Sequence, residues 1–127
     1  MARITESEWR IMKALWTESP LTSRQIINAI DAETNWNAKT IHTLISRLCK
    51  KGAIKAVKQE GSALYKYHAN ISEAECASAE ANHLLRRLYN GSLKTMVSTF
   101  AESDGISKTD IKELREYLER LEKDLSI

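Results

Sequence analysis

The sequence predicts a mainly α-helical protein with one small β-hairpin, divided into an N-terminal domain at residues 1–71 and a C-terminal helical domain at residues 72–127. Apolar residues recur at helical spacing through most of the chain, which is the first observation behind this class. The spacing changes to alternation only on either side of Gly61, where two short strands are expected. A chain of 127 residues has room for one domain and a small extension.

Three helices are expected in the first domain, and each has its own start signal. Residues 5–8 and 22–25, Thr-Glu-Ser-Glu and Thr-Ser-Arg-Gln, both match a capping box, so the first two helices begin there. Asn37 is a good N-cap for the third helix, and Gly52 is placed to end it in a left-handed turn. The apolar residues that these helices should bury are Trp9, Met12, Leu15, Trp16, Ile26, Ile27, Ile30, Ile41, Leu44, Ile45 and Leu48.

The third helix combines an apolar back with a basic front. No acidic residue occurs between positions 35 and 59, whereas a solvated surface helix normally carries both signs of charge. We interpret this helix as one that binds a polyanion, and the alternative is an ordinary amphipathic helix that happens to be basic. Its front and flanking positions are Lys39, Thr40, His42, Thr43, Ser46, Arg47 and Lys50.

A basic hairpin is expected after the third helix. Residues 53–57 and 63–68 are rich in β-formers, and Gly61 permits a tight turn between them. Lys55, Lys58 and Lys66 give the hairpin positive charge. Three helices followed by such a hairpin form a winged helix-turn-helix, in which the third helix enters the major groove and the hairpin follows the adjacent backbone.

The charge distribution supports double-stranded DNA as the partner of the first domain. Residues 1–71 hold 11 Lys and Arg against 6 Asp and Glu, whereas residues 72–127 hold 8 against 11. Thr40, His42 and Thr43 are expected to face base edges. Arg47 suits either bases or phosphates. The side chains expected to bind phosphate are Lys50, Lys51, Lys55, Lys58 and Lys66.

The second domain is expected to pair two copies of the chain. Its apolar stripes are narrow, and about 56 residues rarely close a core alone. In the last helix the leucines and Ile111 are spaced 3, 4, 3 and 4 residues apart, which is typical of a coiled-coil seam. A monomeric three-helix cap on the first domain is the alternative. The expected dimerisation residues are Leu84, Leu88, Met96, Val97, Ile111, Leu114, Leu118, Leu121 and Leu125.

Catalysis, cofactors and membrane insertion are not expected. His42, His68 and His83 show no metal-ligand spacing with Cys49 or Cys76, and no Gly-rich phosphate loop is present. No apolar run approaches the roughly 20 residues that cross a membrane, and no secretory signal opens the chain, so a cytoplasmic protein is expected. A winged helix used only as a protein-binding adaptor remains the alternative from another class, but it needs no basic third helix.

Several stretches in this order resemble the penicillinase-repressor family, which includes penicillinase, methicillin-resistance and copper-responsive repressors. They are Glu8-Trp9 with Trp16, residues 39–48 (KTIHTLISRL), Lys50-Lys51-Gly52, residues 88–91 (LYNG) and residues 111–115 (IKELR). The resemblance implies a homodimer that sits on an inverted-repeat operator and blocks transcription of a β-lactamase-type resistance gene or a stress-response gene. It also implies that Lys39 and Thr40 together read bases. Two positions after Thr40, where the family usually has arginine, this sequence has His42. Copper sensing is not expected, because residues 122–127 do not form the cysteine-rich tail of the copper-responsive relatives.

The resemblance also implies how repression ends. Family members are cut by proteolysis just before a phenylalanine in the dimerisation domain, and a membrane-bound sensor protease is the expected partner. The matching bond here is Thr99–Phe100, with threonine in place of the family's asparagine. A regulator of the same shape that is released by a small effector or metal is the alternative.

Overall fold

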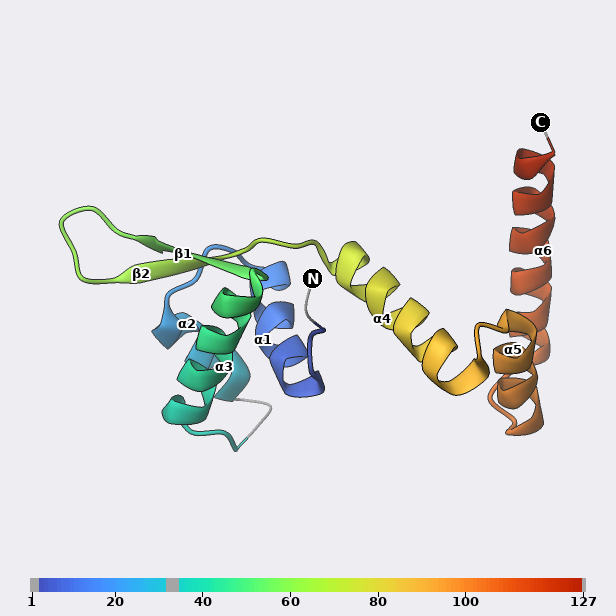
Figure 1. The fold of residues 1–127 in the computed structure, drawn as a ribbon, viewed down its shortest axis with the longest axis horizontal. Coiled ribbons are helices and arrows are strands. Elements are labelled where there is room, and N and C mark those ends of the chain that lie inside the picture. The colour runs from blue at the N-terminus through green and yellow to red at the C-terminus, as the bar shows by residue number, and fades with distance from the viewer. Residues whose placement is uncertain (1–2, 32–34, 127) are drawn as a thin grey trace. The chain divides into compact units, whose positions relative to one another are not determined.

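The computed structural model describes residues 3–31 and 35–126, and it confirms the predicted class (Figure 1). The chain divides into two compact units, Met1–Ala81 and Asn82–Ile127. The elements in chain order are α1 Glu6–Thr17, α2 Ser23–Asp31, α3 Ala38–Lys51, β1 Ile54–Lys58, β2 Tyr65–Ala69, α4 Glu73–Tyr89, α5 Leu93–Glu102 and α6 Lys108–Leu125. The domain boundary predicted after residue 71 lies at the start of α4, whose first half belongs to the first unit.

The start signals of the first three helices are confirmed by their hydrogen bonds. At α1, the Glu8 N–H donates to Thr5 Oγ1 at 3.2 Å, and the Thr5 N–H donates to Glu8 Oε1 at 2.9 Å. Thr22 and Gln25 make the same reciprocal pair before α2, at 2.8 and 3.2 Å. Each capping box satisfies a backbone donor that has no partner within the helix.

The core of the first unit lies where α1, α2, α3 and the hairpin meet. The predicted residues Met12, Leu15, Ile26 and Leu48 are fully buried there. The other buried apolar residues are Ile4, Ile11, Leu21, Ile30, Ile41, Leu44, Ile45, Ala53, Ile54 and Cys76. Because Cys76 comes from α4, the start of that helix is part of this core. Trp9 and Trp16 are partly buried against it and contact each other edge to face, with ring centroids 5.3 Å apart.

The hairpin forms as predicted, with strands one or two residues later than expected. β1 pairs antiparallel with β2, so that Ile54 lies opposite Ala69 and Lys58 opposite Tyr65. Gly61 in the turn has φ +71°, a left-handed conformation that glycine adopts without strain. Tyr67 packs against the core and pairs with Leu21 through two backbone hydrogen bonds of 3.1 and 2.7 Å. Tyr65, opposite Lys58 at the turn end of the hairpin, is 46% exposed.

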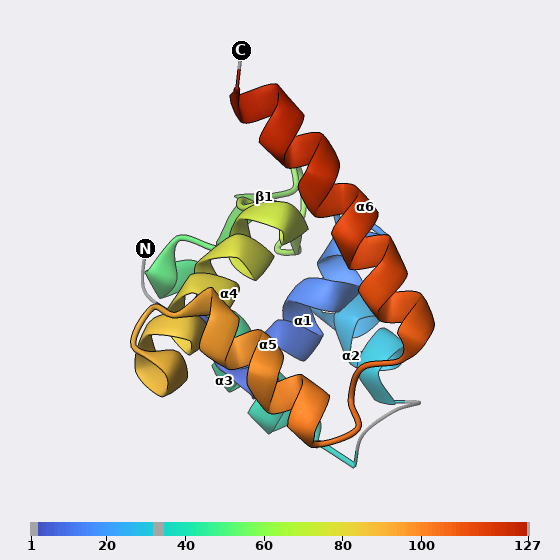
Figure 2. The same cartoon turned by 90° about the vertical axis from the view of Figure 1, so that its right-hand side faces the viewer.

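The second unit holds the end of α4 together with α5 and α6 (Figure 2). Asn90 and Gly91 end α4 with φ values of +50° and +82°. The predicted start of the last helix is confirmed, because Ser107 and Asp110 form a capping box with two hydrogen bonds of 3.0 Å. These bonds lower the pKa of the Asp110 carboxyl. The apolar side chains of this unit remain largely exposed in the single chain.

Candidate nucleic-acid interface

α3 presents its polar side chains to solvent because its apolar side chains are buried. Ile41 and Leu48 are fully buried, and Leu44 and Ile45 are nearly so. This anchoring fixes which side of the helix faces outward. The predicted front positions, which are all exposed, are Lys39, Thr40, His42, Thr43, Ser46, Arg47 and Lys50.

The two threonines at the start of α3 differ in what they can offer to a base. The Thr43 hydroxyl donates to the Lys39 carbonyl at 3.0 Å, so its proton is used inside the helix while a lone pair remains available. The Thr40 hydroxyl makes no such bond to the described residues, and its proton and lone pairs are both available. Thr40 can therefore donate or accept, whereas Thr43 in this rotamer can only accept.

The N-terminus of α3 is held in place by its cap. Asn37 Oδ1 accepts from the Thr40 N–H at 2.8 Å, as predicted. The N-terminal end of a helix carries partial positive charge and unpaired N–H groups, both of which favour an anion. At the other end, Gly52 adopts φ +82° and its N–H donates to the carbonyls of Leu48 and Cys49. The helix therefore ends where the sequence predicted, and the hairpin begins immediately after it.

The basic residues of the hairpin lie on two different faces. Lys55 is opposite His68, and Lys66 is opposite Val57. Because Lys55 and Val57 are two positions apart on β1, the side chains of Lys55, Lys66 and His68 lie on one face of the hairpin. Lys58 is opposite Tyr65 on the other face, next to the turn. The sequence prediction treated the three lysines as one set and missed His68. Alternation along the strand was the signal that could have added it.

Lys51 lies apart from the exposed basic front, because its side chain is engaged within the first unit. Its Nζ donates to Glu8 Oε1 and to the Arg3 carbonyl, the latter at 2.7 Å. Glu8 is fully buried, so its carboxylate holds the ammonium on the side of α3 that faces α1. Burial alone would raise the pKa of the Glu8 carboxyl, but the hydrogen bonds from Lys51 and Thr5 outweigh it, and this pKa is lowered overall.

Six of the nine predicted dimerisation residues are exposed in the second unit. Ile111, Leu114, Leu118 and Leu121 are all exposed along α6, and Leu125 even more so. Leu88 at the end of α4 is also exposed, while Leu84, Met96 and Val97 are partly buried. Exposed apolar stripes of this kind are typical of interaction surfaces.

The predicted scissile bond lies inside α5, within its last turn. The Thr99 carbonyl accepts from the Ser103 N–H at 3.2 Å, and the Phe100 carbonyl accepts from the Gly105 N–H at 2.9 Å. The Thr99 hydroxyl donates to the Thr95 carbonyl at 2.9 Å. Phe100 is 46% exposed in the single chain. The side chain is therefore accessible, but the bond is helical.

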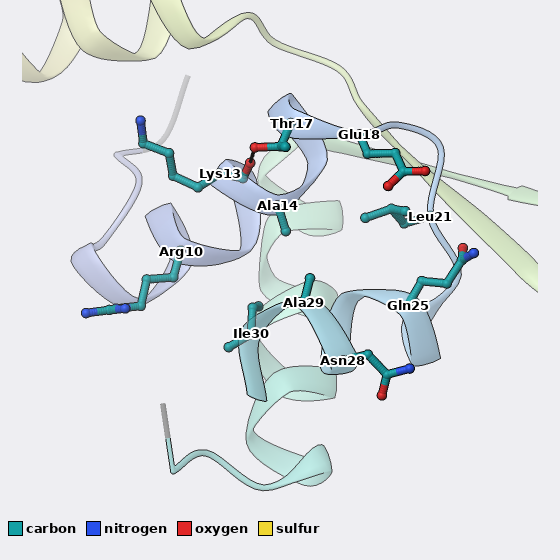
Figure 3. Close-up of a pocket in the computed structure, with 10 residues that line it drawn as sticks. All are labelled: Arg10, Lys13, Ala14, Thr17, Glu18, Leu21, Gln25, Asn28, Ala29 and Ile30. Atoms are coloured by element: carbon teal, nitrogen blue, oxygen red, sulfur yellow. Dashed lines mark hydrogen bonds between the residues drawn. The ribbon is translucent and has the colours of Figure 1, made fainter. Parts of the chain in front are cut away.

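A groove on the first unit lies apart from these residues. It measures about 830 Å³ and runs between α1 and α2, with Ala14, Leu21 and Ile30 in contact with it (Figure 3). Its rim includes Arg10 and Gln25. None of the residues that we predicted to bind DNA lines it.

Residues 3–31 and 35–126 hold no cluster of three or more His, Cys, Asp or Glu that could bind a metal ion. None of the described helices is long and apolar enough to cross a bilayer. Cys76 is buried and Cys49 is partly buried. Burial raises the pKa of both thiols, which makes each a weaker nucleophile.

The fold and the exposed basic front of α3 together define a winged-helix DNA-binding regulator. The family model for penicillinase repressors matches residues 4–120. The chain therefore belongs to the penicillinase repressor family, and it is a transcriptional repressor of the winged-helix class.

Individual relatives agree with this assignment. The chain is 34% identical over 117 residues to the penicillinase repressor of Bacillus licheniformis, which covers 92% of this chain and 90% of the relative. It is 29% identical over 117 residues to the methicillin resistance regulatory protein MecI of Staphylococcus aureus (strain N315), and this alignment covers 92% of this chain and 94% of the relative. The solution structure of the DNA binding domain of the repressor BlaI matches with a TM-score of 0.50 at 32% identity, over 59% of this chain and 93% of that one. Monomeric BlaI of Bacillus licheniformis in complex with the blaP half-operator matches with a TM-score of 0.51 at 31% identity, over 58% and 88%.

Proposed function

We propose that this repressor binds an inverted-repeat operator as a homodimer and controls a β-lactamase-type resistance gene. The observation that carries the proposal is the front of α3, where basic and hydroxyl side chains are exposed over a fully buried aliphatic back. The solved relative in complex with a half-operator supports the same use of this domain. Such a protein acts where the DNA is, in the cytoplasm, and it does not catalyse a reaction.

Sequence would be read at the N-terminal half of α3. Lys39 can bind guanine, and Thr40 can donate to a purine N7 or to a guanine O6. Thr43 keeps its proton inside the helix, so it is suited to accept from the amino group of adenine or cytosine. His42, which lies between Thr40 and Thr43 in the sequence, offers one donor and one acceptor when its imidazole is neutral.

Affinity would come mainly from phosphate contacts. Arg47 and Lys50 lie on the exposed front of α3, and Lys55, Lys58 and Lys66 lie on the hairpin. Each phosphate that they neutralise releases counterions, so binding weakens as salt increases. The two faces of the hairpin cannot both lie flat on one backbone, so Lys55 and Lys66 would act together and Lys58 separately.

The exposed stripe of α6 would hold the two copies together, and proteolysis at Thr99–Phe100 would separate them. A cut there removes all of α6 and leaves the first unit intact. Each copy would then bind one half-site alone, which lowers affinity by about 10²–10⁴-fold. A membrane-bound sensor protease is the proposed partner for this step.

DNA titrations over a salt series test the docking face. Lys50→Ala should lower the slope of log K against log salt by about 1 on operator and random duplex alike. Lys55→Ala and Lys58→Ala separate the two faces of the hairpin, because only a lysine that contacts phosphate changes the slope. If none of the three variants changes the slope, the proposed docking face is wrong.

A further inference from the structure

Lys51 and Glu8 form a charged pair inside a domain whose other basic residues are mostly on the surface. The Lys51 side chain is 22% exposed and that of Glu8 is 1% exposed. Lys51 is the last residue of α3, and Glu8 belongs to the first turn of α1, 43 positions earlier. The ammonium also donates to the Arg3 carbonyl, so the contact joins the end of α3 to the beginning of the chain.

The charge on Glu8 is not explained by helix capping. The capping box needs only an oxygen that accepts from the Thr5 N–H, and glutamine provides one. Glu8 Oε1 accepts from both Thr5 and Lys51, while Oε2 is buried with no partner among the described residues. Burying a carboxylate is costly, so the pair with Lys51 is what makes glutamate tolerable at this position.

The position of the pair connects it with base reading. Residues 39 and 51 are twelve positions apart, which is about 18 Å along a helix. The aliphatic back of α3 fixes which side of the helix faces outward, but apolar contacts are not directional and tolerate a small rotation better than a hydrogen-bonded ion pair does. At a side-chain radius of about 6 Å, a rotation of 10° moves a reading group by about 1 Å, which is enough to spoil a hydrogen bond to a base.

We propose that the Glu8–Lys51 pair is a positioning device that sets the rotation and height of α3, so that Lys51 supports operator specificity without contacting DNA. This inference rests on the proposed operator binding. If Lys51 instead moved to a phosphate, it would leave the buried Glu8 carboxylate without a cation.

The double variant Glu8→Gln/Lys51→Met tests the proposal. Glutamine keeps the capping box, and methionine keeps most of the length of lysine, so the charge pair is removed without leaving one buried charge alone. Operator affinity should fall by about tenfold or more, because base contacts lose their alignment. Affinity for random duplex and the salt slope on either DNA should remain as in the unmodified protein. The control is Lys50→Met, which should lower the slope by about 1 on both duplexes.

The alternative outcomes are distinct. A slope lowered by about 1 in the double variant would make Lys51 a phosphate contact and overturn the inference, as would an unchanged operator affinity. A second measurement does not use DNA: backbone amide exchange at residues 39–44 of the free protein should become faster in the double variant than in the unmodified protein. If the unmodified protein does not distinguish operator from random duplex, the proposed function fails, and unchanged amide exchange would then still refute the positioning role.

Discussion

The substitution Leu118→Asp gives the most direct test of how two copies are held together. Leu118 lies in the middle of the exposed stripe of α6 and is 48% exposed in the single chain. When a partner covers this half of the side chain, the free energy of association gains about 1 kcal/mol per chain, because burying a whole leucine is worth about 1.5–3 kcal/mol. Burying an aspartate without a partner would make association roughly several kcal/mol less favourable.

These terms set the size of the expected effect. Two chains lose the apolar contact and two carboxylates meet at the seam, so the dissociation constant of the dimer should rise by about 10³-fold or more. Sedimentation at micromolar concentration should therefore show a monomer, and operator affinity should fall toward the single-site value. The monomer itself should keep its helical content, because the position is already half exposed.

The matched control is Leu64→Asp, which makes the same change at a leucine that is 61% exposed in the hairpin loop. It should leave the sedimentation behaviour unchanged. If Leu118→Asp remains a dimer at micromolar concentration, the α6 stripe is not the interface. The apolar residues between Leu84 and Phe100 would then be the remaining candidate surface.

Two further predictions concern release and the pH dependence of stability. A fragment that ends at Thr99 should sediment as a monomer and bind the operator about 10²–10⁴-fold more weakly; dimeric binding at full affinity would show that cleavage there is not the switch. The pKa of Glu8 is lower in the folded protein than in the unfolded chain, where it is about 4.3. The ionised Glu8 therefore stabilises the fold above about pH 4.3, and this stabilisation is lost as the pH falls through the lower folded-state pKa. Urea unfolding of Glu8→Gln/Lys51→Met should therefore depend less on pH between about 5 and 3 than unfolding of the unmodified protein, and equal dependence would contradict this assignment.

The features that sequence reasoning predicted well depend on neighbouring residues. The capping boxes at Thr5, Thr22 and Ser107 each involve groups three positions apart, so the local sequence contains the whole interaction. The buried and exposed faces of α3 likewise follow from helical spacing alone.

What the sequence could not supply was the partner of a side chain across the fold. Lys51 follows Lys50 in a basic run, and nothing nearby distinguishes it from a phosphate contact. Its partner Glu8 is 43 positions away and already had a local role in a capping box. Burial of Tyr67 but not of Tyr65 depends on where the core ends, and a strand pattern does not contain that information.

The position of the proposed scissile bond has a consequence for how release would be controlled. Proteases generally need an extended segment, whereas the Thr99 carbonyl accepts a helical hydrogen bond from the Ser103 N–H and the Phe100 carbonyl accepts one from the Gly105 N–H just past the helix end. The last turn of α5 must therefore open before it is cut. A ten-residue helix is marginal on its own, so its stability depends on packing of its apolar side. Contacts that cover Phe100 and its neighbours would thus protect the bond, and the rate of cleavage would follow the fraction of time that this turn is open.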